Sequence, residues 1–529
     1  MASPHTKRGQ APPLAGQTDE VSPRYGVWTR GINLSKIVYM TRKTKNILFL
    51  ILLILFLTAA PLTVFYSLGW RFDWKTKRAI QPGVFYFKVW PKNVQIYLDG
   101  ELKEKTDFFF GSVLIENLLS KKYDVEIKKE EFHIWKKTLE IKKGEVTEAK
   151  NIVLIPENPN FTVMIKKTKD FFFSPDGKKI ILREEDDKNQ SWALKLFELD
   201  KNVKSHLIDE RDISKGEVHP VRDSENGGET QTKGISNGVQ LFNLKFSPNS
   251  KTVLLKVQTK ENLIYYLLEI DKTPAVLTSL DFLNSSAEEV YFNPENPRKL
   301  FTLLPPTAET GKGGGELNEV DLVDQKISLT PLKDIISCSI FNESIYYLNS
   351  SGFLFNTDLS FNQEERLNII AFPLKKKAKY KITASNSKIL LEEDDTLYIF
   401  NRDKKSFQKF FESVKNFKFS SDSKKLVYFN DYEIWVLFLE KKYGQPQKEA
   451  GEQLFITRFS EKIDNVFWYT DHYLIFNAGD KLKIAEIDDR DKINIVDLAE
   501  FKNPEIFWAN KKLYVLSEEN LYVSVELTP

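Results

Sequence analysis

The sequence predicts an all-β protein that is carried by one N-terminal transmembrane helix. Three observations support this fold class. Residues 46–70 contain no charged side chain, although 28% of the chain is charged. From Gly83 onward, apolar and polar side chains alternate in short runs, which is the period of a β-strand with one buried face. After Pro156, a Phe-Ser-Pro-Asp type of turn recurs about every 35–50 residues, with one longer gap, which is typical of repeats that contain several strands each.

The uncharged segment, residues 46–70, is long enough to cross a bilayer. As a helix it would rise about 37 Å, compared with a hydrocarbon core of about 30 Å. A cleaved signal peptide is disfavoured because no clear small-x-small site follows the apolar run, and a buried core helix is disfavoured by the same length and apolarity. The side chains expected in the bilayer or at its outer interface are Ile47, Leu48, Phe49, Leu50, Ile51, Leu52, Leu53, Ile54, Leu55, Phe56, Leu57, Tyr66 and Trp70.

The charges before this segment predict its orientation. Residues 1–45 carry eight basic and two acidic side chains, a net charge of +6, so the rest of a chain of net charge +2 carries −4. Basic residues next to the first span favour the cytoplasmic side. We therefore expect a disordered, basic cytoplasmic stub at 1–45, a single span in the cell membrane, and C-terminal domains outside it. The lone Cys338 excludes an intramolecular disulfide, which fits a bacterial envelope.

A linker at 71–82 is expected to lead to a compact β domain at 83–156. Phe85, Phe87 and Val89 occupy alternate positions of its first strand, and Val94, Ile96 and Leu98 do so in the second. Asp99-Gly100 supplies the positive φ angles of a tight hairpin turn after the second strand.

The same region resembles a known family. The run Pro91-Lys92-Asn93-Val94, followed by a strand and the Asp99-Gly100 hairpin, resembles a PEGA domain, although Lys92-Asn93 replaces the middle pair of the family's tetrapeptide. The resemblance implies an interaction module of the cell envelope without catalytic residues, and a plain β spacer is the alternative. The motif residues are Pro91, Val94, Asp99 and Gly100.

Three adjacent aromatic side chains, Phe108, Phe109 and Phe110, interrupt the alternation. They cannot all face inward in a strand, because neighbouring side chains point to opposite faces. Lipid, a partner or the following domain could cover them, and we expect burial against the following domain.

Residues 157–529 are predicted to form a β-propeller. A strand with an aromatic end stops at Ser-Pro-Asp, because Pro sets φ near −65° and Asp, Asn or Gly tolerate the tight return. Three clear and five looser copies predict eight blades, with seven as the alternative. The clear copies resemble the blades of TolB-like and WD40-like propellers. Their turn residues are Ser174, Pro175, Asp176 and Gly177, then Ser247, Pro248 and Asn249, and then Ser420 and Asp422.

The last repeat lacks a fourth strand. Residues 161–165 precede the first repeat and alternate like a strand, so we expect them to complete the last blade and close the ring.

We expect no catalytic, cofactor-binding or metal-binding residues. The five histidines show no metal spacing, and there is no Gly-x-Ser-x-Gly elbow and no phosphate-binding loop. The acidic runs at 184–187 and 392–395 are interpreted as solvated hairpin tips rather than Ca²⁺ sites. The basic run at 375–379 is interpreted as a loop rather than a nucleic-acid site.

The predicted function is a non-enzymatic, membrane-anchored binding or scaffold protein of the cell envelope. Its expected partners are the membrane and an unidentified envelope protein or glycan, with no nucleic acid. Two alternatives stay open: a propeller-based hydrolase of envelope glycans, which needs two carboxylates at the central channel, and a purely structural spacer.

Overall fold

The computed structural model divides the chain into two units, Met1–Trp70 and Arg71–Pro529. The predicted stub at 1–45 falls almost entirely outside the described part. The described residues are 41–73, 77–186, 191–214, 239–259, 262–283, 287–306, 313–328 and 330–528.

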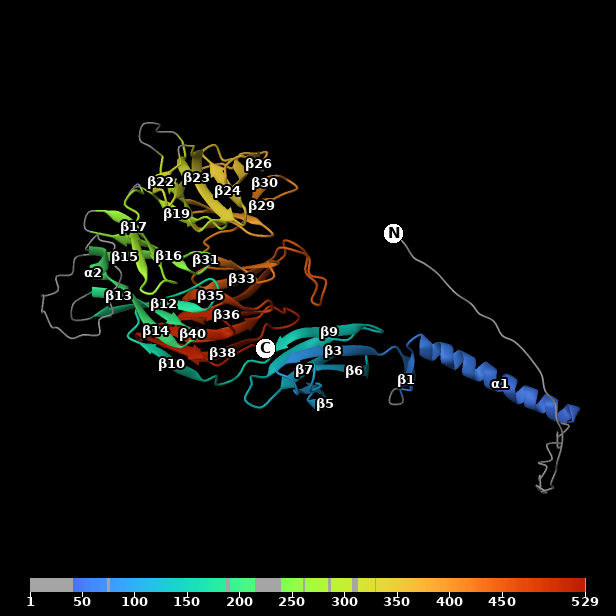
Figure 1. Cartoon of the computed structure of the whole chain (residues 1–529). Helices are drawn as coiled ribbons and strands as arrows, with labels where there is room; N and C mark the ends of the chain where they lie inside the picture. The colour runs from blue at the N-terminus through green and yellow to red at the C-terminus, as the bar shows by residue number, and fades with distance from the viewer. Residues whose placement is uncertain are drawn as a thin grey trace, which may run out of the picture. The chain divides into compact units, whose positions relative to one another are not determined.

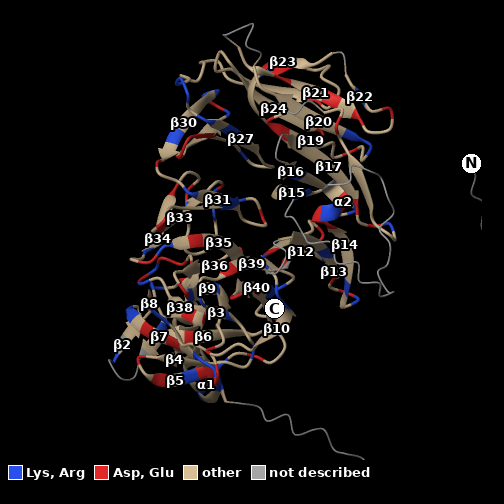
Figure 2. Cartoon of the chain, turned by 90° about the vertical axis from the view of Figure 1, so that its left-hand side faces the viewer, with Lys and Arg blue, Asp and Glu red and all other residues tan. Residues whose placement is uncertain are grey.

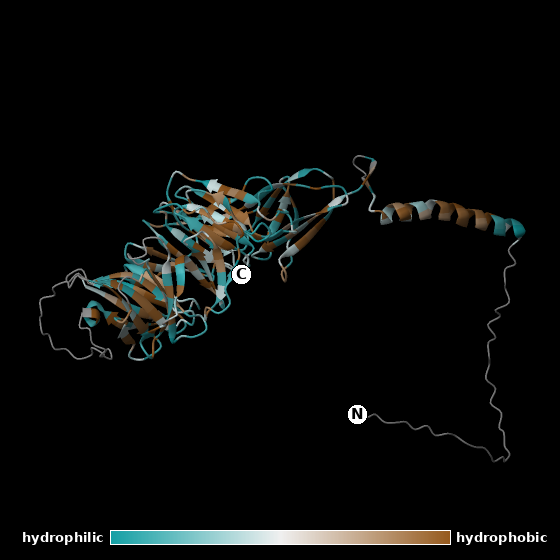
Figure 3. Cartoon of the chain, turned by 90° about the horizontal axis from the view of Figure 1, so that it is seen from above, coloured by the Kyte–Doolittle hydropathy of each residue, from teal (hydrophilic) through white to brown (hydrophobic). Residues whose placement is uncertain are grey.

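The first unit contains the helix α1 (Arg42–Ser67), which is rich in Ile, Leu and Phe along residues 47–57. In the described part of the chain it is the one helix long and apolar enough to cross a membrane. It begins before the uncharged segment, because the Thr41 hydroxyl accepts the Thr44 N–H and caps it. Figure 3 shows the hydrophilic first turn, the hydrophobic middle and a mixed, paler C-terminal part. The prediction that the helix reaches residue 70 is wrong, since it ends at Ser67, just before Gly69 adopts a φ of +80°.

The second unit opens with a short ribbon of β1 (Arg71–Asp73) and β2 (Arg78–Ile80) within the predicted linker. Two sheets then share one hydrophobic core, in the strand orders β6-β3-β9 and β5-β4-β7-β8. We call this part the small β region. Its strands are β3 (Gly83–Trp90), β4 (Gln95–Leu98), β5 (Glu101–Lys105), β6 (Ser112–Leu118), β7 (Lys122–Lys128), β8 (Trp135–Glu140) and β9 (Val146–Val153).

Local expectations for the small β region are mostly confirmed. Phe85 and Phe87 are buried on one face of β3, and Asp99 and Gly100 have φ angles of 51° and 82° in the β4–β5 turn. The expectation of burial for Phe108, Phe109 and Phe110 is wrong, because each is 74% exposed in the turn between β5 and β6.

The rest of the described chain forms eight antiparallel units of four strands, numbered here as sheets 1 to 8. Sheets 3 and 4 are joined by pairing of β21 with β23. Sheet 1 contains β11 (Asp170–Phe173), β12 (Lys179–Asp186), β13 (Ser191–Glu198) and β14 (Val203–Asp209), and sheet 2 contains β15 (Gln240–Phe246), β16 (Thr252–Gln258), β17 (Leu263–Glu269) and β18 (Val276–Ser279). Sheet 3 contains β19 (Glu289–Phe292), β20 (Lys299–Leu304), β21 (Gly315–Asp321) and β22 (Lys326–Ile327), and sheet 4 contains β23 (Leu332–Phe341), β24 (Ser344–Asn349), β25 (Leu354–Asp358) and β26 (Glu365–Arg366). A short helix, α2 (Glu210–Ser214), follows β14.

Sheet 8 combines strands from both ends of this region. Sheet 5 contains β27 (Tyr380–Ala384), β28 (Ile389–Glu393), β29 (Thr396–Asn401) and β30 (Ser406–Phe411), and sheet 6 contains β31 (Asn416–Phe419), β32 (Lys425–Phe429), β33 (Glu433–Phe438) and β34 (Gln453–Arg458). Sheet 7 contains β35 (Ile463–Thr470), β36 (Tyr473–Ala478), β37 (Lys481–Glu486) and β38 (Ile495–Glu500), and sheet 8 contains β39 (Glu505–Ala509), β40 (Lys512–Ser517), β41 (Asn520–Ser524) and β10 (Phe161–Lys166).

These sheets follow one another in a closed order. Each shares a hydrophobic core with the next, and sheet 8 shares one with sheet 1 through Ile165, Phe171 and Tyr514. Figure 2 shows the sheets around a common middle, with β15, β19, β27 and β31 near it. The predicted closing strand is confirmed, since β10 pairs with β41 and lies in the same sheet as β40 (Figure 1). The arrangement is propeller-like, and we call it the ring.

Candidate functional site

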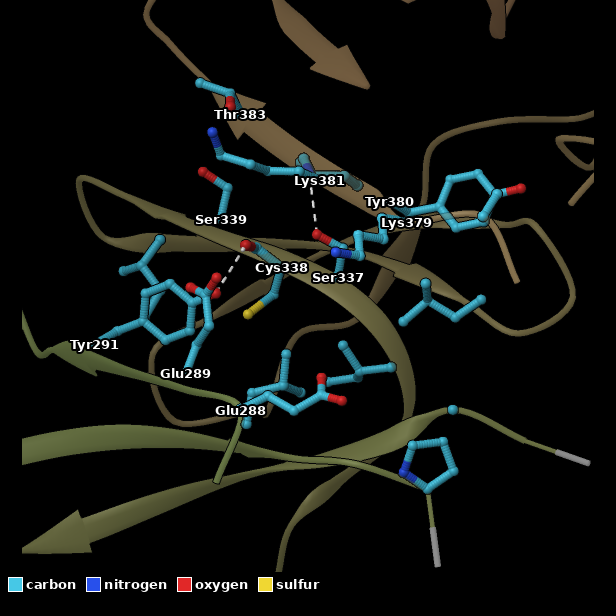
Figure 4. Close-up of a pocket in the computed structure, with 18 of the residues that line it drawn as sticks. Glu288, Glu289, Tyr291, Ser337, Cys338, Ser339, Lys379, Tyr380, Lys381 and Thr383 are labelled. Carbon is cyan, nitrogen blue, oxygen red and sulfur yellow. Dashed lines mark hydrogen bonds between the residues drawn. The ribbon is translucent and has the colours of Figure 1, made fainter. Parts of the chain in front are cut away.

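The first strands of sheets 2 to 5, which are β15, β19, β23 and β27, border a cavity of about 850 Å³. Because these strands come from four different sheets, the cavity exists only when the ring is assembled. Figure 4 shows side chains from β19, β23 and β27 around it. The polar side chains that line it include Lys245, Glu289, Tyr291, Ser339, Lys379 and Lys381.

Tyr291 forms one wall of the cavity. Its hydroxyl donates to the carbonyl oxygen of Cys338 at 3.5 Å, and the Lys245 ammonium lies 4.7 Å from its ring centre. Burial raises the pKa of Tyr291 far above its ordinary value, so the phenol stays neutral. Lys245 is exposed as a residue, but the protein atoms around its ammonium partly desolvate it and lower its pKa, although the carboxylate of Glu289 opposes this. This wall therefore presents a cation held against an aromatic face.

Cys338 lies behind this wall and is 4% exposed. Burial raises the pKa of its thiol to about 12, so it is not a nucleophile at neutral pH. It packs in the core shared by sheets 3 and 4, which confirms its interpretation as a small core residue.

Two serines fix the floor of the cavity between sheets 4 and 5. The Ser337 hydroxyl accepts the Ile382 N–H at 3.0 Å, and the Ser339 hydroxyl accepts the Ala384 N–H at 3.1 Å. The two serines are two residues apart on β23 and so share a face. Both hydroxyls are thus used to join neighbouring sheets.

The lining carries three lysines and two glutamates, a net charge of +1. One of the lysines, Lys381, also pairs with Glu392 at 3.3 Å outside the cavity. The residues described as lining the cavity include no histidine. With its thiol neutral and two of its hydroxyls tied to the backbone, the arrangement suits non-covalent binding of a polar or anionic group better than nucleophilic chemistry.

The other side of the ring interior is filled by aromatic side chains. Phe173 of β11 stacks on Phe507 of β39 at 4.5 Å, and Phe467 of β35 lies 5.5 Å from Phe507. The ammonium of Lys418 sits 3.1 Å from the ring centre of Phe467, and burial lowers its pKa to about 7. The ring is therefore packed on one side and hollow on the other.

The hydrolase alternative requires two nearby carboxylates with separated pKa values. Although Glu505 on β39 is exposed as a residue, the protein atoms around its carboxylate partly desolvate it and raise its pKa, and the charge of Asp170 on β11 adds to the shift. Asp170, however, pairs with Arg183 at 3.0 Å, and the Glu505 side chain is exposed. The requirement is met only in part, because one carboxylate of the pair is already neutralised by an arginine.

The serines of the predicted turns hold their hairpins together through side-chain hydrogen bonds, which the sequence did not predict. In sheets 1, 2 and 6 the serine hydroxyl donates to the Asp or Asn two residues later and accepts the N–H five residues later. Each serine is buried and so closes its own hairpin. The structure places these turns away from the cavity lining, and Pro91, Val94, Asp99 and Gly100 lie in the small β region. The predicted residues therefore do not meet in one site.

One residue of the acidic run at 392–395 is less solvated than expected. Glu393 is 2% exposed, and its carboxylate accepts bonds from Lys375, Tyr380 and Tyr398 at 2.7–3.0 Å. The interpretation of the run at 392–395 as a solvated tip is wrong at this residue, because its position on β28 turns the side chain inward.

A buried ion pair joins the small β region to sheet 7, and the sequence did not predict it. The Lys137 ammonium lies 2.8 Å from the Glu486 carboxylate, with side-chain exposures of 0% and 3%. Lys137 also donates to the carbonyls of Asp488 and Lys492, and the Trp135 indole donates to Glu486 at 2.8 Å. The sequence feature that could have indicated this pair is the position of Lys137 on β8, where it alternates with the buried Trp135 and Leu139.

Further contacts extend this interface along β9. The Val153 N–H donates to the Tyr473 hydroxyl at 3.1 Å, and the Gln445 side chain bonds the backbone of both Val146 and Glu148. Val153 and Ile155 belong to the hydrophobic core shared by sheets 7 and 8. The small β region and the ring are therefore packed as one body.

No family model and no curated protein matches this sequence. Among solved structures, the β-propeller protein Hsv2 of Kluyveromyces lactis is 10% identical, with a TM-score of 0.38 over 64% of this chain and 100% of its own. YCF48 of Cyanidioschyzon merolae is 9% identical, with a TM-score of 0.33 over 55% and 97%. A prolyl endopeptidase is 9% identical, with a TM-score of 0.38 over 68% and 55%.

These similarities are too low to support a conclusion about the fold or function of this chain, so its fold is assigned from the sheet order alone. By that order and by its cavity, the chain is a propeller-like all-β protein with one apolar N-terminal helix.

Proposed function

We propose that this chain is a membrane-anchored binding protein without enzymatic activity, in which the ring holds a partner and the small β region joins the ring to the anchor. The observation that carries the proposal is the cavity on β15, β19, β23 and β27, whose lining has three lysines against two glutamates beside Tyr291 and whose one thiol stays neutral. The bound group is an anionic or polar part of a protein or glycan.

The location follows from the anchor. In this proposal α1 crosses the cell membrane once, the basic stub stays in the cytoplasm, and both β regions stand outside, in a bacterial cell envelope. The small β region acts as a PEGA-like interaction module. Its hairpin at Asp99-Gly100 and its two-sheet core support this role. The lack of a disulfide-forming cysteine pair supports the location in a bacterial envelope.

Photo-crosslinking tests the binding proposal. A photoreactive amino acid replaces Thr383 in the cavity or, as the control, the exposed Phe455 of the full-length chain. Irradiation of native membranes followed by mass spectrometry is expected to enrich a partner at position 383 only. Adding Lys245→Glu, which reverses the charge on the cavity wall, is expected to abolish that product. Equal products at both positions, or none, would contradict the proposal.

The hydrolase alternative receives some support from the raised pKa of Glu505. Purified full-length protein would then release fragments from envelope glycans, and Glu505→Gln would stop the release. The non-enzymatic proposal predicts no release by either protein.

A further inference from the structure

We propose that the turn containing Phe108, Phe109 and Phe110 inserts into the surface of the bilayer that holds α1, as a second membrane contact of the chain. The three side chains are each 74% exposed, on a turn between β5 and β6 of the small β region. Scattered exposed apolar residues need no explanation, but three consecutive ones at one tip form an interaction surface. This inference rests on the proposed membrane anchorage.

Asp107 holds the turn in shape. One of its carboxylate oxygens accepts the N–H groups of Phe109 and Phe110 at 2.8 and 2.5 Å, and the other accepts the N–H and hydroxyl of Ser112 at 2.7 and 2.9 Å. These bonds lower the pKa of Asp107 to about 2. Hydrogen bonds within the turn therefore stabilise the conformation in which the phenylalanines are exposed.

Gly111 closes the base of the turn against β3. Its φ is +66°, its carbonyl accepts the Val89 N–H at 2.9 Å, and a Cβ atom there would lie 2.4 Å from the Val89 carbonyl oxygen. Phe108 and Phe109 also pack edge to face at 5.7 Å. The tip is thus a fixed apolar wedge, which can be buried without further ordering of its backbone.

Lipid is the occupant that the rest of the chain favours. Residues 68–82 separate the end of α1 from β3, and fifteen extended residues reach about 50 Å at most. The turn lies at the opposite end of β3, where Ser112 pairs with Lys88, and the length of that strand adds about 25 Å. The linker therefore keeps the turn within about 75 Å of the end of α1, which lets it reach the same bilayer. The carboxylate of Asp107 is turned inward to backbone groups, while Lys92 and Lys105 near the turn are exposed. An apolar tip with basic flanks suits an interface with anionic lipid.

Fluorescence quenching in the full-length protein tests this. In a Cys338→Ser background, which removes the only native thiol, Phe109→Cys is labelled with nitrobenzoxadiazole and placed in nanodiscs of phosphatidylcholine and phosphatidylglycerol. Spin-labelled lipid is expected to remove most of the fluorescence at position 109. The matched control, Phe242→Cys, replaces a phenylalanine that is 71% exposed on β15 of the ring and is expected to keep its fluorescence.

Two further variants separate the possible failures. A label at Leu52→Cys in α1 reports the anchor itself. Quenching at position 52 but not at 109 overturns the inference while the anchorage stands, and quenching at neither position overturns both. Asp107→Ala is expected to weaken quenching at position 109 only, with an unchanged circular dichroism spectrum. A label at 109 that is shielded from water but not quenched by lipid indicates a protein partner and also overturns the inference.

Discussion

At the residue scale, the three clear turns share a backbone conformation as well as a serine. The third residue after each serine has a positive φ, which is 68° at Gly177, 57° at Ser250 and 55° at Ser423. Only the first of these turns has glycine there, the residue that adopts this conformation without strain. The other two hairpins keep some strain that a single substitution can remove.

Ser423→Gly is expected to stabilise the protein by about 0.5–1 kcal/mol, because the strain relieved exceeds the added entropy of the unfolded chain. Gly177→Ala is expected to destabilise it by about 1–2 kcal/mol, because φ is +68° and the new methyl group would lie 2.8 Å from the Asn510 side chain. Urea unfolding measures both changes. Destabilisation by the first variant would contradict the strain argument.

Lys137→Met is expected to cost about 3–5 kcal/mol, because it leaves the Glu486 carboxylate buried without its cation. Burial raises the pKa of Glu486, and Lys137 opposes that rise. Without the lysine the pKa rises further, so the variant should regain stability as the pH falls toward it. The double variant Lys137→Met with Glu486→Leu should recover most of the loss. Urea unfolding at several pH values tests this, and a penalty independent of pH would refute it.

His472 should make the protein sensitive to acid. Burial lowers its pKa from 6.5 to about 4, so the unfolded chain binds a proton that the folded chain does not. Stability is expected to fall as the pH drops from about 6.5 toward 4, by at most about 1.4 kcal/mol per pH unit from this group. His472→Gln should remove that part of the slope, and an unchanged slope would assign the acid sensitivity to other groups.

At the element scale, the ring depends on one short strand, β10, which completes sheet 8. Its Ile165 is buried in the core between sheets 8 and 1, whereas Val163 is 45% exposed. The strand therefore supplies both backbone pairing and apolar contact at the closing point.

Deleting residues 158–166 is expected to lower the melting temperature sharply, because sheet 8 loses a strand and the ring its closure. Ile165→Ala should cost about 2–4 kcal/mol, and Val163→Ala should cost little. Thermal unfolding compares the three variants. A melting temperature unchanged by the deletion would show that closure is not needed.

Much of this element level could be predicted from the sequence, because period-two alternation and turn chemistry are local. Phe85 and Phe87, the Asp99-Gly100 hairpin and the closing strand were found in this way. The cavity could not be found, because its lining comes from four sheets that meet only in the ring. Lys137 and Glu486 are also far apart in sequence, and a single chain gives no sign of which inward lysine meets which glutamate.

At the scale of the whole molecule, the small β region and the ring share a buried ion pair, backbone hydrogen bonds and a hydrophobic core. A hydrophobic core shared by two regions couples their unfolding, whereas domains without such a shared core move separately. The two β regions are therefore expected to unfold in one calorimetric transition. Lys137→Met should split this transition in two, whereas Lys136→Met, one residue earlier at an exposed position, should not.

The pairing of β10 with β41 also has a consequence for timing. Lys166 pairs with Asn520, so the first strand of the ring emerges during synthesis long before its partner exists. Until β41 is made, the unpaired edge of β10 can pair with wrong strands. Sheets 1 to 7 therefore assemble as an incomplete ring, which we call an arc. A ribosome that stops early therefore releases an arc with a free edge at each end, which proteases and chaperones can recognise. Only a chain made to its last strand can hide both edges.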